Sequence, residues 1–522
     1  MAKQKNILFI TLDQWRAECL SVLKHDNVKT PNIDALAAEG MLFKEHYCQA
    51  LPCGPSRASI YTGMYQHNHR SICNGTPLHA GFTNIALELR KAGFSPALFG
   101  YTDTSMDPAE FHPNDPLLRS YEKVLPGFDA QVLLDNEALP WIADLKAKGY
   151  DFNHGEVLKP KQLNVQNDQS GRTYAPALFS AQDTSAAFLT NEVIKYLSVR
   201  HKSNWFVHMS YISPHPPYIV PEPYHNMISP DDVPIPLRKP TMKQEMKQHP
   251  YLKHYLSKPE GSGSSYSTRA FDNLTMDENE ILQVRATYYA MISEVDSQLG
   301  RLIDYLKKSN LYQNTLIIVT SDHGDQLGDH WQFGKHSYFD QSLHIPLVIR
   351  DPDVAADKFR GQQISSFTES IDIMPTILQW LSLTQPTQCD GRSLQQIIYT
   401  GSAPEGWRSE VHTEFDFRDL DKTDHVGRGI AGLRHDECSM SIIRDKDFKY
   451  VHFNNWPALL FDLNKDPEEF NNLAEDPQYQ SIVLKYAQNL LSWRMKYEDN
   501  RLANIKLTNN GPEEYAGQAL SG

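Results

Sequence analysis

A cysteine and an arginine, one helical turn apart, form the most distinctive reactive pair in the sequence. Cys53 stands two residues before Pro55, which suits the first turn of a helix, and the run continues to a glycine stop at Gly63. Cys53 is therefore expected at a helix N-terminus, where the helix dipole favours anions. Arg57, one turn further along, could stabilise a nucleophile or a bound oxyanion.

Two other interpretations of this pair follow from the residues alone. A cysteine phosphatase loop requires the pattern C-x5-R, but the sixth residue after Cys53 is Ser59. A structural cysteine that precedes a helix is the plainer alternative. The spacing speaks against the phosphatase loop and leaves the other interpretations open.

Polar or ionisable side chains follow four apolar runs that are predicted to be strands. The runs are residues 6–12, 96–99, 205–210 and 315–320. The side chains that follow them are Asp13 and Gln14, Tyr101 and Asp103, His215, and Asp322 and His323. In open parallel sheets, ligands bind beyond the carboxyl ends of the strands. A single Asp at such a place could be a turn or cap residue, but four strand ends together favour a binding site on one rim.

Three of these side chains suit a divalent metal ion. Asp13, Asp322 and His323 supply two carboxylates and an imidazole. This set fits Mn²⁺, Fe²⁺ or Zn²⁺ better than Ca²⁺, which prefers six to eight oxygen ligands. A turn with a hydrogen-bonded histidine is the alternative for residues 322–324.

The elements that must position this rim alternate along the chain. The continuous apolar run 6–12 is typical of a parallel strand covered on both faces. Another strand is expected at 345–349, and helices are expected at 32–40, 83–93, 184–197 and 371–383. A longer helix is expected behind a capping box formed by Thr275 and Glu278. The alternation predicts an α/β fold, a large and mainly parallel sheet sandwiched by helices.

The C-terminal part of the chain has a different pattern. Short strands are expected at 438–444, 450–453 and 459–463, followed by a helix at 482–497. We therefore predict a catalytic α/β domain over residues 1–425 and a small α+β subdomain over 426–522. Within the first domain, the polar segment 221–274, with its low-complexity run 260–265, is interpreted as an insertion or lid. Residues 501–522 are expected to form a terminal arm.

The net charge, the apolar runs and the cysteine content of the chain argue against some classes of partner and setting. The 522 residues carry 50 Lys and Arg against 64 Asp and Glu, and the net charge of −14 argues against a nucleic acid as the main partner. An anionic small molecule is still allowed, because a local site can oppose the net charge. No apolar run approaches the ~20 residues of a membrane span. The six cysteines form no C-x-x-C pair, which predicts a reducing, cytoplasmic setting.

The residues around Cys53 also resemble a family signature. The pattern C-x-P-S-R at 53–57 is similar to the sulfatase signature, in which the cysteine is oxidised after translation to formylglycine (3-oxoalanine). Further runs that look like sulfatase landmarks occur in the expected order at 30–34, 321–324, 369–376 and 460–467. The chain thus resembles the sulfatase family of the alkaline phosphatase superfamily over nearly its whole length.

The resemblance extends to one branch of that family. Asp13-Gln14 and Asp322-His323 replace the Asp-Asp and Asp-Asn pairs of common sulfatases, and residues 100–103 replace the G-K-W-H loop. With the runs 214–217, 334–335 and 414–419, this pattern resembles phosphonate monoester hydrolases and phosphodiesterases, which also hydrolyse aryl sulfates. Two residues depart from that branch, Ser56 in place of Ala and Asp103 in place of Thr. Asp103 would weaken the binding of an anion, or it would select a substrate with a positive group.

The resemblance implies a role for each candidate residue. Metal ligands would be Asp13, Gln14, the modified Cys53, Asp322 and His323. Arg57 would stabilise the formylglycine alkoxide, and His215 would protonate the leaving group. Asn74, Tyr101 and Lys335 would contact the non-bridging oxygens, with Asp103 beside them. One hydroxyl of the hydrated aldehyde would attack sulfur or phosphorus in line, and the covalent ester would then break down by expulsion from the hemiacetal.

Two further functions and several partners complete the expectations. A dedicated arylsulfatase is the second enzyme interpretation, and a non-catalytic anion-binding protein with unmodified Cys53 is the alternative outside enzymes. The family resemblance implies a small anionic ester as substrate, a formylglycine-generating maturation enzyme and a homo-oligomer. Mn²⁺ is the expected metal, with Fe²⁺, Zn²⁺ or Ca²⁺ as alternatives.

Overall fold

An eight-stranded sheet forms the centre of the computed structural model, which describes residues 4–514 apart from 136, 152–175, 201, 258–275, 419 and 421–429. Its strand order is β10-β2-β9-β8-β1-β7-β5-β6. The bounds are β1 Asn6–Leu12, β2 Met41–Phe43, β5 Ala97–Gly100, β6 Asp129–Leu133, β7 Phe206–Tyr211, β8 Thr315–Ser321, β9 Leu347–Arg350 and β10 Gln362–Ile364. Only β9 pairs antiparallel with its neighbours among these strands, so the prediction of a large, mainly parallel sheet is confirmed.

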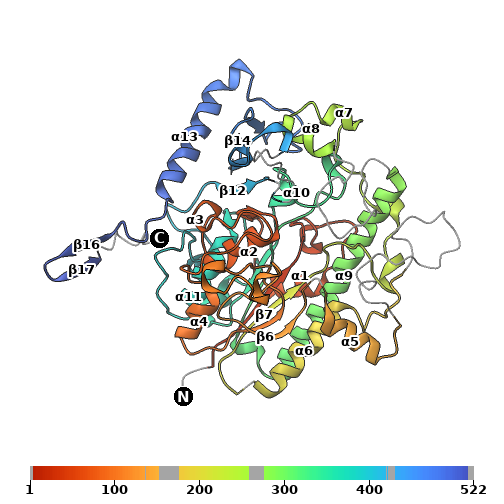
Figure 1. The fold of residues 1–522 in the computed structure, drawn as a ribbon. Helices are drawn as coiled ribbons and strands as arrows, with labels where there is room; N and C mark the ends of the chain where they lie inside the picture. Colours follow the sequence, from red (N-terminus) through yellow and green to blue (C-terminus); the bar gives the residue numbers. More distant parts are fainter. Residues whose placement is uncertain are drawn as a thin grey trace.

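Helices cover both faces of this sheet (Figure 1). Because successive side chains of a strand point to opposite faces, Leu8 and Ile10 of β1 pack in one apolar cluster and Ile7 and Phe9 in the other. The first cluster contains residues of α1 Pro31–Ala38, α6 Ser185–Arg200 and α9 Glu278–Lys308. The second contains residues of α2 Cys53–Thr62, α4 Ile85–Lys91 and α11 Ile373–Trp380. All seven residues of β1 are buried, as its continuous apolar run predicts.

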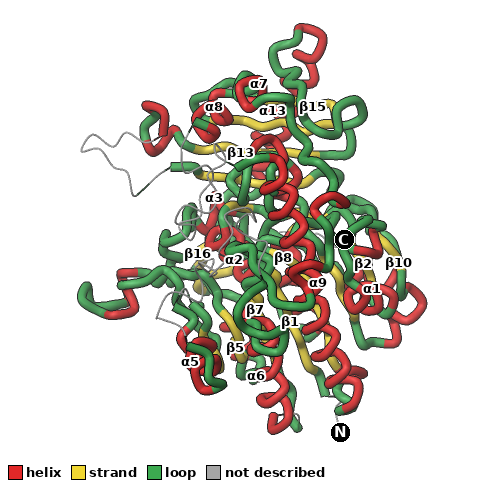
Figure 2. Tube along the Cα trace, turned by 90° about the vertical axis from the view of Figure 1, so that its right-hand side faces the viewer, coloured by secondary structure: helices red, strands yellow, loops and turns green. Residues whose placement is uncertain are grey.

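A second, five-stranded sheet lies beyond one end of the first, with α8 and α13 close to it (Figure 2). Its order is β15-β14-β13-β12-β4. The bounds are β4 Ala50–Leu51, β12 Val411–Asp416, β13 Ser439–Arg444, β14 Phe448–Phe453 and β15 Leu459–Asp462, and α13 spans Gln480–Lys496. The predicted C-terminal strands and helix are therefore confirmed. The sheet also takes β4 and β12 from earlier in the chain, and the predicted boundary at 426 lies outside the described residues.

The remaining elements are short. They are α3 Gln66–His69, α5 Leu139–Ala147, α7 Met242–Glu245, α8 Pro250–Leu256, α10 Asp340–Leu343, α12 Gln395–Thr400, β3 His46–Tyr47, β11 Thr368–Glu369, β16 Ile505–Thr508 and β17 Gly511–Glu514. Within the described residues, no helix combines the length and the apolar character that crossing a membrane requires.

The structure refines two local predictions, the capping box of α9 and the insertion at 221–274. The long helix α9 begins as expected, but its capping box consists of Asp277 and Glu280 rather than Thr275 and Glu278. The Asp277 carboxylate accepts from the Glu280 amide at 2.9 Å, and a carboxylate caps a helix as well as a hydroxyl does. In the predicted insertion, helix α8 buries Tyr251 and Leu252 in the apolar cluster of the second sheet. The low-complexity run 260–265 lies outside the described residues.

A close approach between β5 and β7 predicts a strong effect of Gly100→Ala. Gly100 has φ of 108°, and a Cβ added there would lie 2.3 Å from the carbonyl oxygen of Ser210. The substitution must therefore strain the backbone and also push the two strands apart. Gly93→Ala is the matched control, because Gly93 has φ of 83° but nothing lies within 4 Å of its added Cβ. We expect a loss of about 1–2 kcal/mol for Gly93→Ala and a clearly larger one for Gly100→Ala in thermal unfolding; equal losses would contradict the close approach.

Candidate active site

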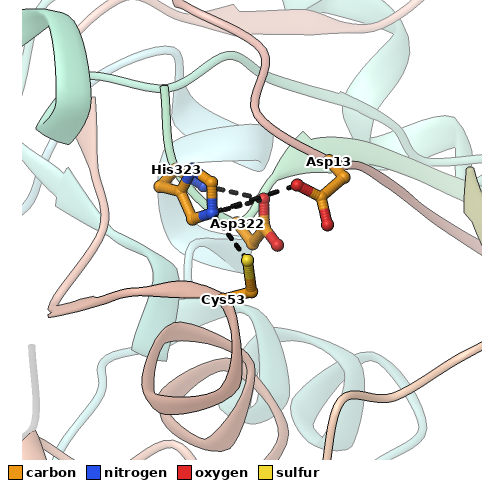
Figure 3. A group of neighbouring side chains, drawn as sticks. All are labelled: Asp13, Cys53, Asp322 and His323. Carbon is orange, nitrogen blue, oxygen red and sulfur yellow. Dashed lines mark hydrogen bonds and ion pairs between the residues drawn. The ribbon is translucent and has the colours of Figure 1, made fainter. Parts of the chain in front are cut away.

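Strands β1 and β8 bring two acidic residues side by side. The two strands run parallel with Leu12 opposite Ser321, so the next residues, Asp13 and Asp322, leave the same edge of the sheet. Cys53 begins α2 and His323 follows Asp322, and the four side chains point toward one another (Figure 3). One ligand atom from each lies within 4.8 Å of every other, and all four residues are buried.

His323 is oriented to offer a lone pair to this cluster. Its Nδ1 lies 2.9 Å from the carbonyl oxygen of Gly324, which can only accept a hydrogen bond, so Nδ1 carries the proton. Burial lowers the pKa of His323, which favours the neutral ring. Its Nε2 lies 3.1 Å from Sγ of Cys53 and 3.9 Å from Oδ1 of Asp13. A histidine held through its other nitrogen in this way is typical of metal ligands.

Asp13 has one satisfied and one unsatisfied oxygen. Its Oδ2 accepts hydrogen bonds from Arg57 at 3.2 Å and from the Tyr101 hydroxyl. Its Oδ1 is buried and has no hydrogen-bond partner among the described residues. Burial alone would raise the pKa of Asp13, but His215, Arg57 and Lys335 hold it well below its usual range. An ionised, unpartnered oxygen beside a neutral imidazole fits a divalent metal ion, so the residues present suit the predicted cofactor.

Arg57 holds the ends of four strands together. Its Nε donates to Oδ2 of Asp322 at 2.9 Å and its Nη1 to the hydroxyl of Ser210 at 2.8 Å. Its Nη2 donates to Asp13 and Tyr101, and the guanidinium lies 4.3 Å from the centre of the Tyr101 ring. The side chain is completely buried. In this arrangement Arg57 orients two of the predicted metal ligands.

Gln14 and Lys335 are joined by a hydrogen bond. The Lys335 ammonium donates to Oε1 of Gln14 at 3.0 Å and lies 3.0 Å from Nε2 of His215. The Nδ1 atom of His215 donates to the carbonyl oxygen of Pro216 at 2.7 Å, so Nε2 is the acceptor. Burial, together with Lys335, lowers the pKa of His215 to about 4. The structure thus brings both predicted residues to the site and makes Lys335, rather than His215, the group that carries the proton.

The three predicted substrate-binding residues lie around the first turn of α2 and the Arg57 side chain. Oδ1 of Asn74 accepts from the Gly54 amide at 2.8 Å, which ties Asn74 to the start of α2. Tyr101 is buried against Arg57 and Asp13. Asp103 has φ of 54° and is only 7% exposed, and burial raises its pKa to about 7. Asp13 and Asp322 raise the pKa of this carboxyl further, whereas Arg57 and Lys335 lower it.

Two residues of the site, Ser210 and Asp325, were missed in the sequence. Ser210 accepts from Arg57, and Asp325 accepts from Gln14 and Tyr218. Ser210 ends a predicted strand and Asp325 follows Asp322 by three residues, so position alone could have flagged them. Their partners lie far away in the sequence, and no local pattern indicates them.

Comparison with known proteins agrees with this geometry. Residues 5–383 match the sequence model of the Sulfatase family, and residues 328–496 match that of the C-terminal part of N-sulphoglucosamine sulphohydrolase. The chain belongs to the sulfatase family. It is a hydrolase with the α/β fold of this family, within the alkaline phosphatase superfamily, and the resemblance predicted from the 53–57 run is confirmed.

Several relatives of this sulfatase-family chain match almost end to end. A multifunctional alkaline phosphatase superfamily protein, PehA, of Trinickia caryophylli is 39% identical over 97% of this chain and 98% of its own length. The crystal structure of a phosphonate monoester hydrolase of Agrobacterium radiobacter has a TM-score of 0.90 and 41% identity, covering 98% of this chain and 100% of the other. An arylsulfatase of Clostridium perfringens is 26% identical over 92% of both chains.

The raised pKa of Asp103 predicts a pH-dependent cost to stability in the metal-free protein. The folded chain keeps a proton on this carboxyl where the unfolded chain has lost it, so the stabilisation is complete below about pH 4 and is lost as the pH rises toward 7. Asp103→Asn abolishes this loss, so its thermal midpoint relative to the unchanged protein should rise between pH 4 and 7. Because the pKa of Asp103 rises from 3.8 to about 7, the pH-dependent difference in the free energy of unfolding has an upper limit of about 4 kcal/mol.

Asp107→Asn is the control for this experiment. Backbone amides of Ala80 and Ala109 lower the pKa of Asp107, so its stabilisation is present above about pH 4 and lost on acidification. The variant should therefore lose stability relative to the unchanged protein as the pH rises from 3 to 5. A flat Asp103→Asn profile would show that this carboxyl is not protonated near neutral pH.

Proposed function

We propose that the protein hydrolyses phosphonate monoesters, phosphodiesters and aryl sulfates through a covalent ester on Cys53 after its conversion to formylglycine. The observation that carries this proposal is the convergence of Cys53 with Asp13, Asp322 and His323, ahead of a helix that also supplies Arg57. The relatives named above include a phosphonate monoester hydrolase and an arylsulfatase. Burial raises the pKa of the Cys53 thiol, so the unconverted side chain is a poor nucleophile here.

A divalent ion is proposed to bind Asp13, Gln14, Asp322 and His323 together with the converted Cys53. We propose Mn²⁺, with Fe²⁺, Zn²⁺ or Ca²⁺ as alternatives, because the donors combine oxygen with one imidazole nitrogen. Such an ion lowers the pKa of a bound hydroxyl and neutralises charge on the transferred group.

The other polar residues are proposed to act on the substrate. Lys335, with its ammonium between Gln14 and His215, supplies positive charge to a non-bridging oxygen. His215 and Lys335 share a hydrogen bond through which a proton can pass to the departing oxygen. Asn74 retains its amide NH₂ for the substrate because its oxygen is bound to Gly54. The Tyr101 hydroxyl donates to Asp13 and accepts from Arg57, and the family resemblance places this residue near the same oxygens.

Asp103 is proposed to set the charge of the substrate. Its carboxyl is buried near Asp13 and Asp322, so a positive or hydrogen-bonding group on the substrate would stabilise it. Where the pH is high enough to ionise this carboxyl, a second negative charge on the substrate would be repelled. This favours singly charged esters, the class to which phosphonate monoesters, phosphodiesters and sulfate esters belong.

Conversion of Cys53 gives the direct test of this function. We expect the peptide containing Cys53, isolated from the native source, to have lost its sulfur, and Cys53→Ala to lower kcat by about 10³-fold or more. Cys48→Ala is the control, since Cys48 is a buried thiol outside the cluster. Full activity of Cys53→Ala would overturn the mechanism. An unmodified Cys53 without turnover on metal addition would favour the non-catalytic anion-binding protein.

Two substrates separate the enzyme interpretations. The ratio of kcat/KM for an aryl phosphonate monoester to that for an aryl sulfate should exceed one if Asp13-Gln14 and Asp322-His323 set the preference of the site. A dedicated arylsulfatase would show the reverse ratio.

We further propose a homo-oligomer in which the hairpin β16–β17 packs on a second copy of the chain. The hairpin projects from the body of the protein (Figure 1), and an isolated two-stranded hairpin is only marginally stable in water. Leu502 and Leu507 near it are 77% and 79% exposed. Deletion of residues 501–522 should reduce the mass measured by analytical ultracentrifugation. An unchanged mass would contradict the proposal that this hairpin forms the contact between copies. Leu484→Ser, on the exposed side of α13, tests whether that helix forms the contact instead.

A cytoplasmic location and a formylglycine-generating maturation enzyme are also proposed. The six cysteines all lie among the described residues, and no disulfide joins any two of them, in keeping with a reducing compartment. Cell fractionation tests the location. Co-expression with a maturation enzyme, followed by mass analysis of the Cys53 peptide, tests the partner.

A further inference from the structure

The carboxylate of Asp325 joins three loops of the site. It is completely buried, and its Oδ1 accepts from the backbone amides of Leu327 and Gly334, each at 2.9 Å. Its Oδ2 accepts from the amide NH₂ of Gln14 and from the hydroxyl of Tyr218. Asp325 therefore ties the end of β1 to the segment that carries His215 and to the segment that carries Lys335.

These contacts fix which way the Gln14 amide points. A carboxylate can only accept hydrogen bonds and an ammonium can only donate them. Because Asp325 lies at one end of the amide and Lys335 at the other, Nε2 must face Asp325 and Oε1 must face Lys335. The amide has no second orientation that satisfies both neighbours.

The backbone of Gln14 needs this support. Gln14 has φ of 68°, a left-handed conformation that is uncommon for a residue with a side chain. The backbone amide of Gln14 donates to Oδ1 of Asp322, and its backbone carbonyl oxygen accepts from the Tyr288 hydroxyl at 2.8 Å. The side chain is thus held in a strained loop by contacts on every side, and Asp325 supplies the contact that sets its polarity.

We propose that Asp325 is a positioning residue that orients the Gln14 amide, and through it Lys335, without touching the substrate or the metal. This rests on the proposed function, in which Gln14 and Lys335 act on the metal and the substrate. A merely structural carboxylate would hold the loop through the amides of Leu327 and Gly334 alone.

A charge exchange between Asp325 and Gln14 distinguishes these roles. In Asp325→Asn, the amide oxygen can still accept from Leu327 and Gly334, but the NH₂ group then faces Gln14. Gln14 must turn its oxygen toward the new NH₂ and its own NH₂ toward Lys335, which places two donors together. Gln14→Glu alone places two carboxylates together. In the double variant, the new Glu accepts from both the Asn and Lys335, and the Tyr218 hydroxyl can accept from the same NH₂ group instead of donating to Oδ2.

The measurements are the affinity for Mn²⁺, by titration calorimetry on the chain with unconverted Cys53, and the thermal midpoint. We expect each single variant to lose about 10–100-fold in Mn²⁺ affinity and the double variant to regain at least tenfold over the worse single. Tyr218→Phe removes a hydroxyl that contacts both Asp325 and Gln14 but keeps Asp325 and Lys335 at the two ends of the Gln14 amide, so its Mn²⁺ affinity should fall less than that of either single variant. If losses in the double variant are the product of the single losses, the positioning role is wrong.

The same cycle keeps this inference separate from the proposed function. If a single variant fails to fold when expressed alone, the recovery of soluble, folded protein in the double variant is itself the coupling, and its absence overturns the role. Coupling in Mn²⁺ affinity without any ester turnover in the unchanged protein would support the positioning role and defeat the proposed function. Ester turnover in the unchanged protein without coupling between the two substitutions would support the proposed function and defeat the positioning role.

Discussion

The completely buried guanidinium of Arg57 is the constraint on which the rest of the site depends. A buried charge is tolerated only when it is paired and hydrogen-bonded, and Arg57 finds its partners at the ends of β1, β5, β7 and β8. The two carboxylates it needs, Asp13 and Asp322, are the same groups that a metal ion needs. The position of helix α2 is therefore coupled to the assembly of the cation site, because Arg57 and Cys53 stand one turn apart on the same helix.

Some polar atoms of the site have hydrogen-bond partners within the protein, and others do not. Oδ2 of Asp13 and Oδ2 of Asp322 accept hydrogen bonds from Arg57, and Nδ1–H of His323 donates to the carbonyl oxygen of Gly324. Oδ1 of Asp13 is left without a hydrogen-bond partner among the described residues, and Nε2 of His323, which contacts Sγ of Cys53, lies 3.9 Å from it. Polar networks rigidify a core when they are fully satisfied, so the unsatisfied oxygen of Asp13 marks the place where a ligand would complete this network.

Much of this arrangement could be predicted from the sequence, for a physical reason. Buried parallel strands require continuous apolar runs, so β1 and β8 were predicted almost to the residue, and their carboxyl ends gave Asp13 and Asp322. The pairing of side chains was not predictable, because Gln14 meets Asp325 across 311 residues of chain. The antiparallel course of β9 and the share of β4 in the second sheet were missed likewise, since both depend on neighbours that no local periodicity encodes.

The short strand β4 links the second sheet to Cys53 through the backbone. Leu51 pairs with Phe415 of β12, and Cys53 follows only two residues later. A tilt of the small sheet would therefore be transmitted through two covalently linked residues to the head of α2. The register between β4 and β12 therefore helps to set the position of Cys53, whereas loops at the far edge of the small sheet have no such direct connection to it.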